Sequence, residues 1–345
     1  MKLKKQKYIL VVGVFLVFVA ASKHWQPTYV KLSYPETWPE PHYESTNNPL
    51  TKEGVWLGRN LFYDPVLSAD STISCASCHL SFTSFTHVDH ALSHGINDSI
   101  GTRNSPVLVN LAWNTSFMWD GAVNHLDVQA LAPIAHPAEM GENIQHVVQK
   151  LNRLPRYKKW FYAAYGDSVA TGEHTLKALA QFQLTLISSN SKYDKVMAGN
   201  EVFNDQEKKG YQLFQQHCNR CHQEPLFTTG EFANNGLSVD TLLNDSGRMR
   251  ITLNAKDSLK FKIPTLRNIE FSKPYMHDGR FEHLSEAIAH YSNTVVESPT
   301  LDSGLVGGIL LTSNERVDIL AFLLTLSDRA FMFNPELGYP KKMTP

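Results

Sequence analysis

The stretch Ser74-Cys75-Ala76-Ser77-Cys78-His79 decides how this chain is interpreted. The chain has only four cysteines, and the second pair, Cys218 and Cys221, is also followed directly by a histidine, His222. Histidine makes up 15 of the 345 residues, so one accidental histidine after a Cys-x-x-Cys unit is about a 4% event (15/345), and two are far rarer. Cys-x-x-Cys-His is the attachment pattern of a c-type haem. The sequence therefore predicts two covalent haem c groups, attached at Cys75, Cys78, Cys218 and Cys221, with His79 and His222 as iron ligands.

Two other interpretations of paired cysteines fit less well. A four-cysteine zinc site would leave the histidine after each pair without a purpose. A thioredoxin-like dithiol would need a βαβ context, and no such pattern surrounds either pair.

The N-terminus has the pattern of an export signal. Lysines at positions 2, 4, 5 and 7 precede an apolar run over residues 8–21, and Val19-Ala20-Ala21 is similar to a cleavage site. The run is short for a membrane span, which needs about 20 apolar residues. Residues 1–22 are therefore predicted to be a signal peptide, with an uncleaved anchor as the alternative, and the protein is expected in the periplasm.

The rest of the chain is long enough for two domains. Residues 23–50 form a Pro-, Tyr- and Trp-containing segment expected to be an extended lead-in. A boundary near residues 190–203 would give an N-terminal unit, 51–195, and a C-terminal unit, 196–345. Each unit has a Leu-Phe pair and a nearby glycine before its cysteines, which suggests one small haem-binding unit used twice.

Helical periodicity dominates the pattern of apolar residues. Faces of this kind occur at Ile144–Leu154 and Leu176–Leu186, and Thr312-Ser-Asn-Glu315 has the form of a capping box before an apolar helix. Strand-like alternation is sparse. We therefore expect a mostly α fold of two cytochrome c-like haem domains with long loops. The formal net charge of −1 gives no indication of nucleic-acid binding.

Five further stretches resemble one known family. They are RNSPVLVN (103–110), FMWDG (117–121), HPAEMG (136–141), IPTLRN (263–268) and PYMHDGRF (274–281). In this order, between about residues 54 and 327, they resemble the bacterial dihaem cytochrome c peroxidases, a family that includes the MauG-type enzymes. The resemblance implies that the haem on His79 reacts with peroxide and that the haem on His222 takes electrons from a donor.

The resemblance also implies roles for four residues near the first haem. Glu139 matches the family's acid-base glutamate, which moves the proton as the O–O bond of peroxide breaks. Gln129 and Pro133 match residues that shape the distal pocket, and Trp119 matches a tryptophan between the two haems. The simpler alternatives are a solvated carboxylate for Glu139, a helix-surface amide for Gln129 and a core aromatic for Trp119.

Three further candidates concern metal coordination. Asn104 matches a calcium ligand whose partners are backbone carbonyls near Ser272 and Pro274. Tyr291 lies fourteen residues after His277, where ordinary dihaem peroxidases have a methionine ligand and MauG-type enzymes have a tyrosine. The alternative is a packed tyrosine with another ligand, for which Met276 is the nearest methionine.

His94 lies in the loop where peroxidases that need reductive activation carry a histidine cap on the first haem. MauG-type enzymes lack this cap, and His87 and His90 compete with His94 for such a role. The chain thus combines a peroxidase feature at His94 with a MauG feature at Tyr291.

The leading expectation is an exported dihaem oxidoreductase of the cytochrome c peroxidase type. It would reduce hydrogen peroxide with electrons from a small donor such as a c-type cytochrome. Two alternatives are a MauG-like enzyme that oxidises Trp or Tyr residues of a partner protein, and a dihaem electron carrier without catalysis. A bound Ca²⁺ and a homodimer follow from the resemblance alone.

Overall fold

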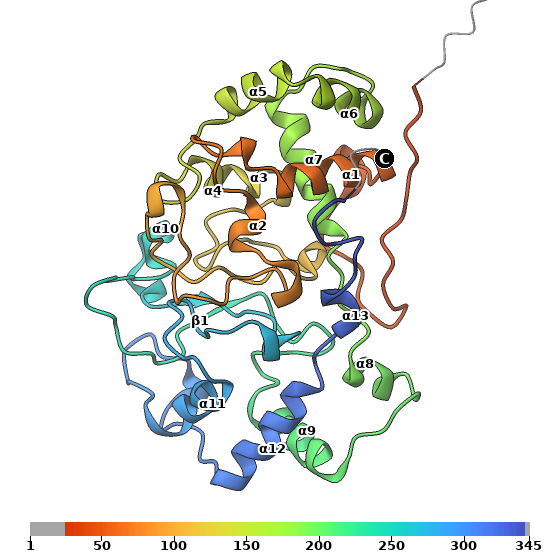
Figure 1. Ribbon diagram of the computed structural model, residues 1–345. Coiled ribbons are helices and arrows are strands. Elements are labelled where there is room, and N and C mark those ends of the chain that lie inside the picture. The colour runs from red at the N-terminus through yellow and green to blue at the C-terminus, as the bar shows by residue number, and fades with distance from the viewer. Residues whose placement is uncertain (1–24, 342–345) are drawn as a thin grey trace, which may run out of the picture.

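The computed structural model describes residues 25–341, and the predicted export signal lies outside this range. Within it the chain is mainly helical, and the strands are two segments of two residues each, so the expected mostly α fold is confirmed (Figure 1). The helices are α1 (Lys52–Tyr63), α2 (Cys75–Cys78), α3 (Leu126–Gln129), α4 (Leu131–Ala135), α5 (Ile144–Arg153), α6 (Pro155–Tyr165), α7 (Gly172–Leu184), α8 (Lys192–Met197), α9 (Asp205–His217), α10 (Met249–Thr252), α11 (Leu284–Asn293), α12 (Ser313–Leu324) and α13 (Arg329–Met332). The strands β1 (Phe232–Ala233) and β2 (Phe261–Lys262) pair antiparallel.

Two hydrophobic cores organise the described part of the chain. The upper core in Figure 1 is built by α1, α5, α6 and α7, with Leu57, Leu61 and Phe182 fully buried. The lower core is built by α9, α11 and α12 around Phe214 and Phe322, which are also fully buried. Long loops between the cores carry the stretches that resemble the peroxidase family.

A glycine at the centre of each core lets two helices approach closely. A Cβ atom at Gly58 of α1 would lie 1.8 Å from the carbonyl oxygen of Ala178 in α7. A Cβ atom at Gly210 of α9 would lie 1.9 Å from the carbonyl oxygen of Asp318 in α12. Real carbon atoms do not approach so closely, so only glycine fits at either crossing. A glycine at a close helix crossing therefore precedes each of the two cysteine pairs in the sequence.

The predicted helix signals at α5 and α12 are confirmed. Leu151 of α5 is buried, and the helix ends at Arg153, two residues before Pro155 opens α6. The α12 helix begins with the expected capping box, in which Thr312 accepts from the amide of Glu315 and the Glu315 carboxylate accepts from the amide of Thr312.

Both ends of the described chain pack against the upper core. Residues 25–50 contain a single short 3-10 turn at Ser45–Asn47, and their Trp38 lies edge-on to Trp113 with ring centroids 5.2 Å apart. After α12 the chain returns upward in Figure 1, where Phe331 enters the upper core. Arg59 of α1 donates to the carbonyl of Pro335 at 2.6 Å. The C-terminal segment thus packs against the N-terminal half.

Two arginines, Arg103 and Arg267, join the two halves. Arg103 donates to Asp120 at 2.6 Å and to both carboxylate oxygens of Asp245, at 2.6 and 2.9 Å. Arg267, which is fully buried, forms a two-bond ion pair with Asp194, and its guanidinium lies 4.5 Å from the ring centre of Trp38, a residue of the upper core. Both arginines belong to stretches that resemble the peroxidase family, so these stretches hold the halves together.

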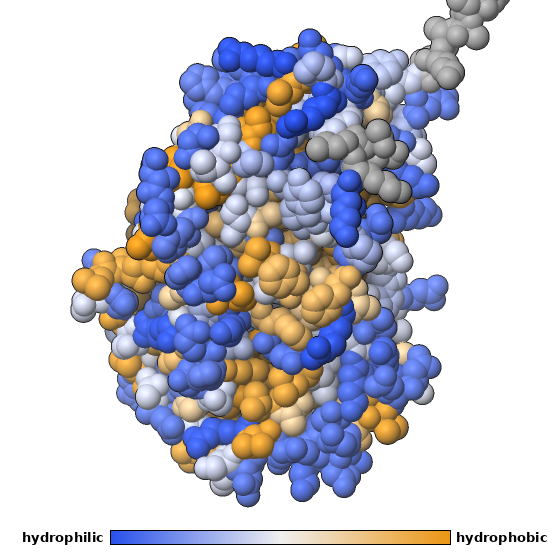
Figure 2. Space-filling view, viewed as in Figure 1, coloured by the Kyte–Doolittle hydropathy of each residue, from blue (hydrophilic) through white to orange (hydrophobic). Residues whose placement is uncertain are grey.

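The surface shown in Figure 2 is divided by polarity. Its upper end is largely hydrophilic, whereas apolar side chains gather over the lower half. Between residues 25 and 341, no helix is both long enough and apolar enough to span a membrane.

Candidate functional site

A cavity of about 900 Å³ lies between the two cores and is lined by residues of both Cys-x-x-Cys-His units. Ligand pockets in proteins commonly measure 300–1,000 Å³, so this one is near the large end of the range. Cys78 and His79 contribute from the first unit, and Cys218, Cys221 and His222 from the second. None of the four cysteines takes part in a disulfide. The cavity is therefore shaped to receive large groups beside both motifs.

Both motif histidines have the hydrogen bonds of iron ligands. The Nδ1–H of His79 donates to the carbonyl of Phe85 at 2.7 Å, and Nδ1 of His222 lies 3.1 Å from the carbonyl of Phe227 and 3.2 Å from that of Pro264. A carbonyl can only accept, so Nδ1 carries the proton and Nε2 is left for a metal. Burial lowers the pKa of each imidazole to about 4, which keeps it neutral, as ligation requires. The residues present fit two haem groups.

Glu139 lines this cavity in a half-buried position. Its amide donates to the carbonyl of His136, and its carbonyl accepts from the amide of Ile96, so its backbone is held from two sides. Burial raises the pKa of the Glu139 carboxyl, and the nearby His136 imidazole, 3.6 Å away, lowers it in part. A carboxyl whose pKa is raised toward neutrality is suited to take up and return a proton.

Gln129 and Pro133 line the same cavity as Glu139. Gln129 ends α3, and its side-chain amide lies 3.8 Å from the sulfur of Met118. Pro133 lies in the following helix, α4. The structure thus brings together all three residues proposed to surround the first haem.

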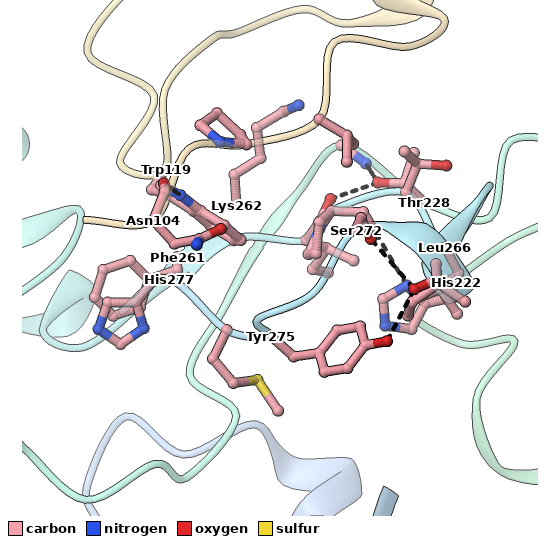
Figure 3. A pocket seen from close by; sticks show the side chains of 18 of the residues that line it. Asn104, Trp119, His222, Thr228, Phe261, Lys262, Leu266, Ser272, Tyr275 and His277 are labelled. Carbon is pink, nitrogen blue, oxygen red and sulfur yellow. Dashed lines mark hydrogen bonds between the residues drawn. The ribbon is translucent and has the colours of Figure 1, made fainter. Parts of the chain in front are cut away.

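Trp119 is held rigidly in the cavity wall. Its indole nitrogen donates to the backbone carbonyl of Asn104 at 2.8 Å, and its own carbonyl accepts from the amide of Lys262 at 2.7 Å. Figure 3 shows the indole on one side of the cavity and His222 on the other. The bond to Lys262 ties the tryptophan to strand β2 of the C-terminal half.

Asn104 is buried, and three of its polar groups have partners. Its amide nitrogen donates to the carbonyl of His277 at 2.8 Å, and its side-chain nitrogen donates to that of Ala91 at 2.9 Å. Its backbone carbonyl accepts from Trp119, which leaves the side-chain oxygen for another partner. Ser272 and Pro274 line the same cavity. In residues 25–341, no three His, Cys, Asp or Glu side chains are arranged for a metal, so a calcium ion here would take amide and carbonyl oxygens.

Tyr291 reaches the cavity from α11, on the face predicted from the sequence. Leu284, Ala287 and Ile288 share that face, and all three are buried. Burial raises the pKa of the Tyr291 phenol to about 12; the nearby Cys218 and Cys221 act in the same direction, whereas a hydrogen bond from Asn235 lowers it. The phenol therefore lies near the second pair of cysteines.

Met276 also lines the cavity, so it remains a competitor of Tyr291. The side-chain amide of Asn235 lies 3.4 Å from its sulfur. Asn235 thus contacts both Tyr291 and Met276, the two candidate ligands opposite His222. No motif in the sequence identified Asn235 as a site residue.

His94 is not among the residues that line the cavity. Its Nδ1 lies 2.5 Å from the carboxylate of Asp98, and its ring lies 4.7 Å from that of His90. The backbone near His94 still supports the site, because Ile96 holds the carbonyl of Glu139. The capping role of His94 stays a prediction.

Comparison with known proteins identifies a family of dihaem enzymes, in agreement with a cavity lined by two haem-attachment motifs. The family model described as di-haem cytochrome c peroxidase matches residues 52–202. A methylamine utilization protein MauG from Methylorubrum extorquens is 35% identical over 304 residues, covering 85% of this chain and 82% of the relative.

The chain belongs to the dihaem cytochrome c peroxidase family. A cytochrome c551 peroxidase from Nitrosomonas europaea is 35% identical over 245 residues, covering 70% of this chain and 73% of that protein. The crystal structure of a MauG-like protein associated with microbial copper homeostasis superimposes with a TM-score of 0.81 at 29% identity, covering 91% of this chain and all of that one. The predicted family, the oxidoreductase class and dihaem peroxidase function are thereby confirmed, and relatives of the MauG type are present as well.

Proposed function

We propose that this dihaem peroxidase is exported to the periplasm and reduces hydrogen peroxide to water with two electrons from a small donor such as a c-type cytochrome. The observation that carries the proposal is one cavity lined by both haem motifs and by Glu139. The haem held by His79 would supply the iron that binds peroxide, and the haem held by His222 would supply the entry point for electrons. Residues 51–195 and 196–345 would then be the peroxidatic and electron-transfer units.

Glu139 is the proposed proton carrier. Reduction of H₂O₂ to two waters consumes two electrons and two protons, and one proton must move between the two peroxide oxygens as they separate. Glu139 faces the cavity, its pKa is raised by burial, and His136, which lines the same cavity, lies 3.6 Å away as a second titratable group. Gln129 and Pro133 would narrow the space beside Glu139, and the Gln129 amide would donate to the bound peroxide.

Trp119 is proposed to relay electrons between the two haem sites. Its indole is oriented by the hydrogen bond that its nitrogen donates to the carbonyl of Asn104. A Ca²⁺ ion that binds the Asn104 side-chain oxygen and the carbonyls near Ser272 and Pro274 would stiffen the same wall. Tyr291 is the proposed ligand opposite His222, and its oxygen would favour the oxidised iron more than a thioether does.

One observation favours MauG-like protein oxidation as a second candidate. Tyr291 occupies the place of the usual methionine, its helix directs it into the cavity, and a relative named MauG is 35% identical. The two functions differ in their product. A peroxidase consumes a donor's electrons, whereas the alternative leaves oxidised Trp or Tyr residues in a partner protein, which mass spectrometry of the mixed proteins would detect. A non-catalytic electron carrier would show neither product.

The experiment that tests the proposed function compares Glu139→Gln with the wild-type holoprotein. We expect steady-state peroxide consumption with a reduced c-type cytochrome to fall by about 10²–10⁴-fold, the usual contribution of a general acid-base group. Glu142→Gln is the matched control, because Glu142 pairs with Lys150 at 2.9 Å and does not line the cavity. Both variants must retain two haems. Unchanged turnover in Glu139→Gln would remove Glu139 from the proposal.

A further inference from the structure

Lys262 is a cavity residue that the proposed mechanism does not use. It belongs to strand β2, where it pairs with Phe232, and its amide donates to the carbonyl of Trp119. Figure 3 shows its side chain extending between Trp119 and His222, with an ammonium group that makes no hydrogen bond to the residues drawn. A lysine is thus held by its backbone at the proposed electron path and points into the cavity.

The ammonium of Lys262 lacks an acidic partner among residues 25–341. Three lysine or arginine side chains line the cavity, and the other two, Arg103 and Arg250, lie 2.6 and 3.7 Å from Asp245. Burial lowers the pKa of Lys262 to about 8, and no neighbouring charge opposes that effect. An ion removed from water without a partner is costly, so a compensating anion is expected at this place.

The carboxylates that line the cavity are already engaged elsewhere. Asp120 is bonded to Arg103 and Asp302 to Arg220, while Glu224 accepts from Tyr193. Glu139 lies beside His136. Within the described part of the chain, no free carboxylate is therefore left for Lys262. A haem carries two propionate carboxylates, and two haems in this cavity would bring four.

We propose that Lys262 is the counter-ion of a haem propionate and thereby sets the reduction potential of that haem. The inference rests on the proposed function only in placing both haems in this cavity. An ammonium bonded to a propionate withdraws negative charge from the haem and favours the reduced iron. Removal of the ammonium therefore lowers the reduction potential. Lys262 acts here as a positioning residue, since it touches neither peroxide nor iron.

The test is a spectroelectrochemical titration of both haems in the holoprotein. Lys262→Met is expected to shift the reduction equilibrium of one haem about tenfold toward the oxidised form, which is ~59 mV for one electron. Lys262→Arg keeps the charge and is expected to keep the potential. The two haems differ in their proposed ligands and therefore in their spectra, so the shifted signal shows which haem provides the propionate.

Lys260→Met is the matched control, because Lys260 lies two residues away, bonds to Asp257 at 3.6 Å and does not line the cavity. If Lys262→Met yields too little holoprotein, Lys262→Gln removes the charge with less loss of polarity. Unchanged potentials in a charge-removing variant with both haems attached, or an equal shift in Lys260→Met, would overturn the inference. Neither result depends on peroxide turnover, so the inference and the proposed function fail separately.

Discussion

The indole nitrogen of Trp119 donates to the backbone carbonyl of Asn104 across 2.8 Å, which fixes the ring in the wall between the two motif histidines. The Trp119→Phe variant keeps an aromatic ring and loses both this bond and the easily oxidised indole. We expect both haems to attach and donor reduction of the second haem to stay normal, while electron transfer between the haems slows at least tenfold. Flash or stopped-flow reduction separates the two steps. Equal inter-haem rates in both proteins would restrict Trp119 to packing.

Tyr291 is expected to bind the iron opposite His222. In Tyr291→Met a soft thioether replaces the phenol oxygen, and the reduction potential of that haem should rise. In Tyr291→Phe the ligand is lost, so the absorption spectrum of the same haem should change. Tyr275→Phe is the control, because Tyr275 also lines the cavity but donates its hydroxyl proton to the carbonyl of Ile269. An unaltered absorption spectrum in Tyr291→Phe would contradict ligation by Tyr291 and favour Met276 as the iron ligand.

The ion pair of Arg267 and Asp194 is expected to stabilise the fold in a pH-dependent way. Burial alone would raise the pKa of Asp194, but the bonds from Arg267 outweigh it and lower the pKa. A lowered pKa in the folded state gives stability that is present above the unfolded value of about 4 and is lost as the pH falls through the folded value. The Asp194→Asn variant leaves the buried Arg267 unpaired, so we expect a loss of roughly 3–5 kcal/mol at pH 7. Urea unfolding at pH 7 and at lower pH should show this difference shrinking; a constant difference would contradict the account.

Gly58 is expected to be irreplaceable at the crossing of α1 and α7. In Gly58→Ala the new methyl group would overlap the carbonyl of Ala178 and push the helices apart. Overpacking of this kind costs about 1–3 kcal/mol. Thermal unfolding measures the loss, and Gly338→Ala is the control, because a Cβ there meets its nearest atom at 3.8 Å. Equal melting temperatures for the two variants would show that the helices have room to separate.

Much of this site was predictable because many of its functional residues belong to short sequence motifs. The two Cys-x-x-Cys-His units and the helical face of Tyr291 are features of neighbouring residues, and the structure places them in one cavity. Glu139, Gln129 and Trp119 were found through the resemblance of longer stretches to a family.

Other contacts could not be predicted, because they join distant parts of the chain. The fit of Gly58 against Ala178, the return of Phe331 to the upper core and the position of Lys262 each depend on tertiary packing. The periodic spacing of apolar residues predicts helices but does not predict which distant residues will contact one another. The sequence also suggested His94 as a cap; its ring pairs with Asp98, and the capping role stays a prediction.

The most direct test is rapid mixing of the fully oxidised holoprotein with one equivalent of hydrogen peroxide, followed through the haem absorption bands. Because His94 does not line the cavity, we expect the wild-type protein to react at once, without prior reduction, and His94→Ala to react at the same rate. Glu139→Gln should react about 10²-fold or more slowly. A Glu139→Gln protein that reacts as fast as wild type would contradict the central claim. A wild-type protein that stays inert until one haem is reduced would contradict the open site and support His94 as its cap.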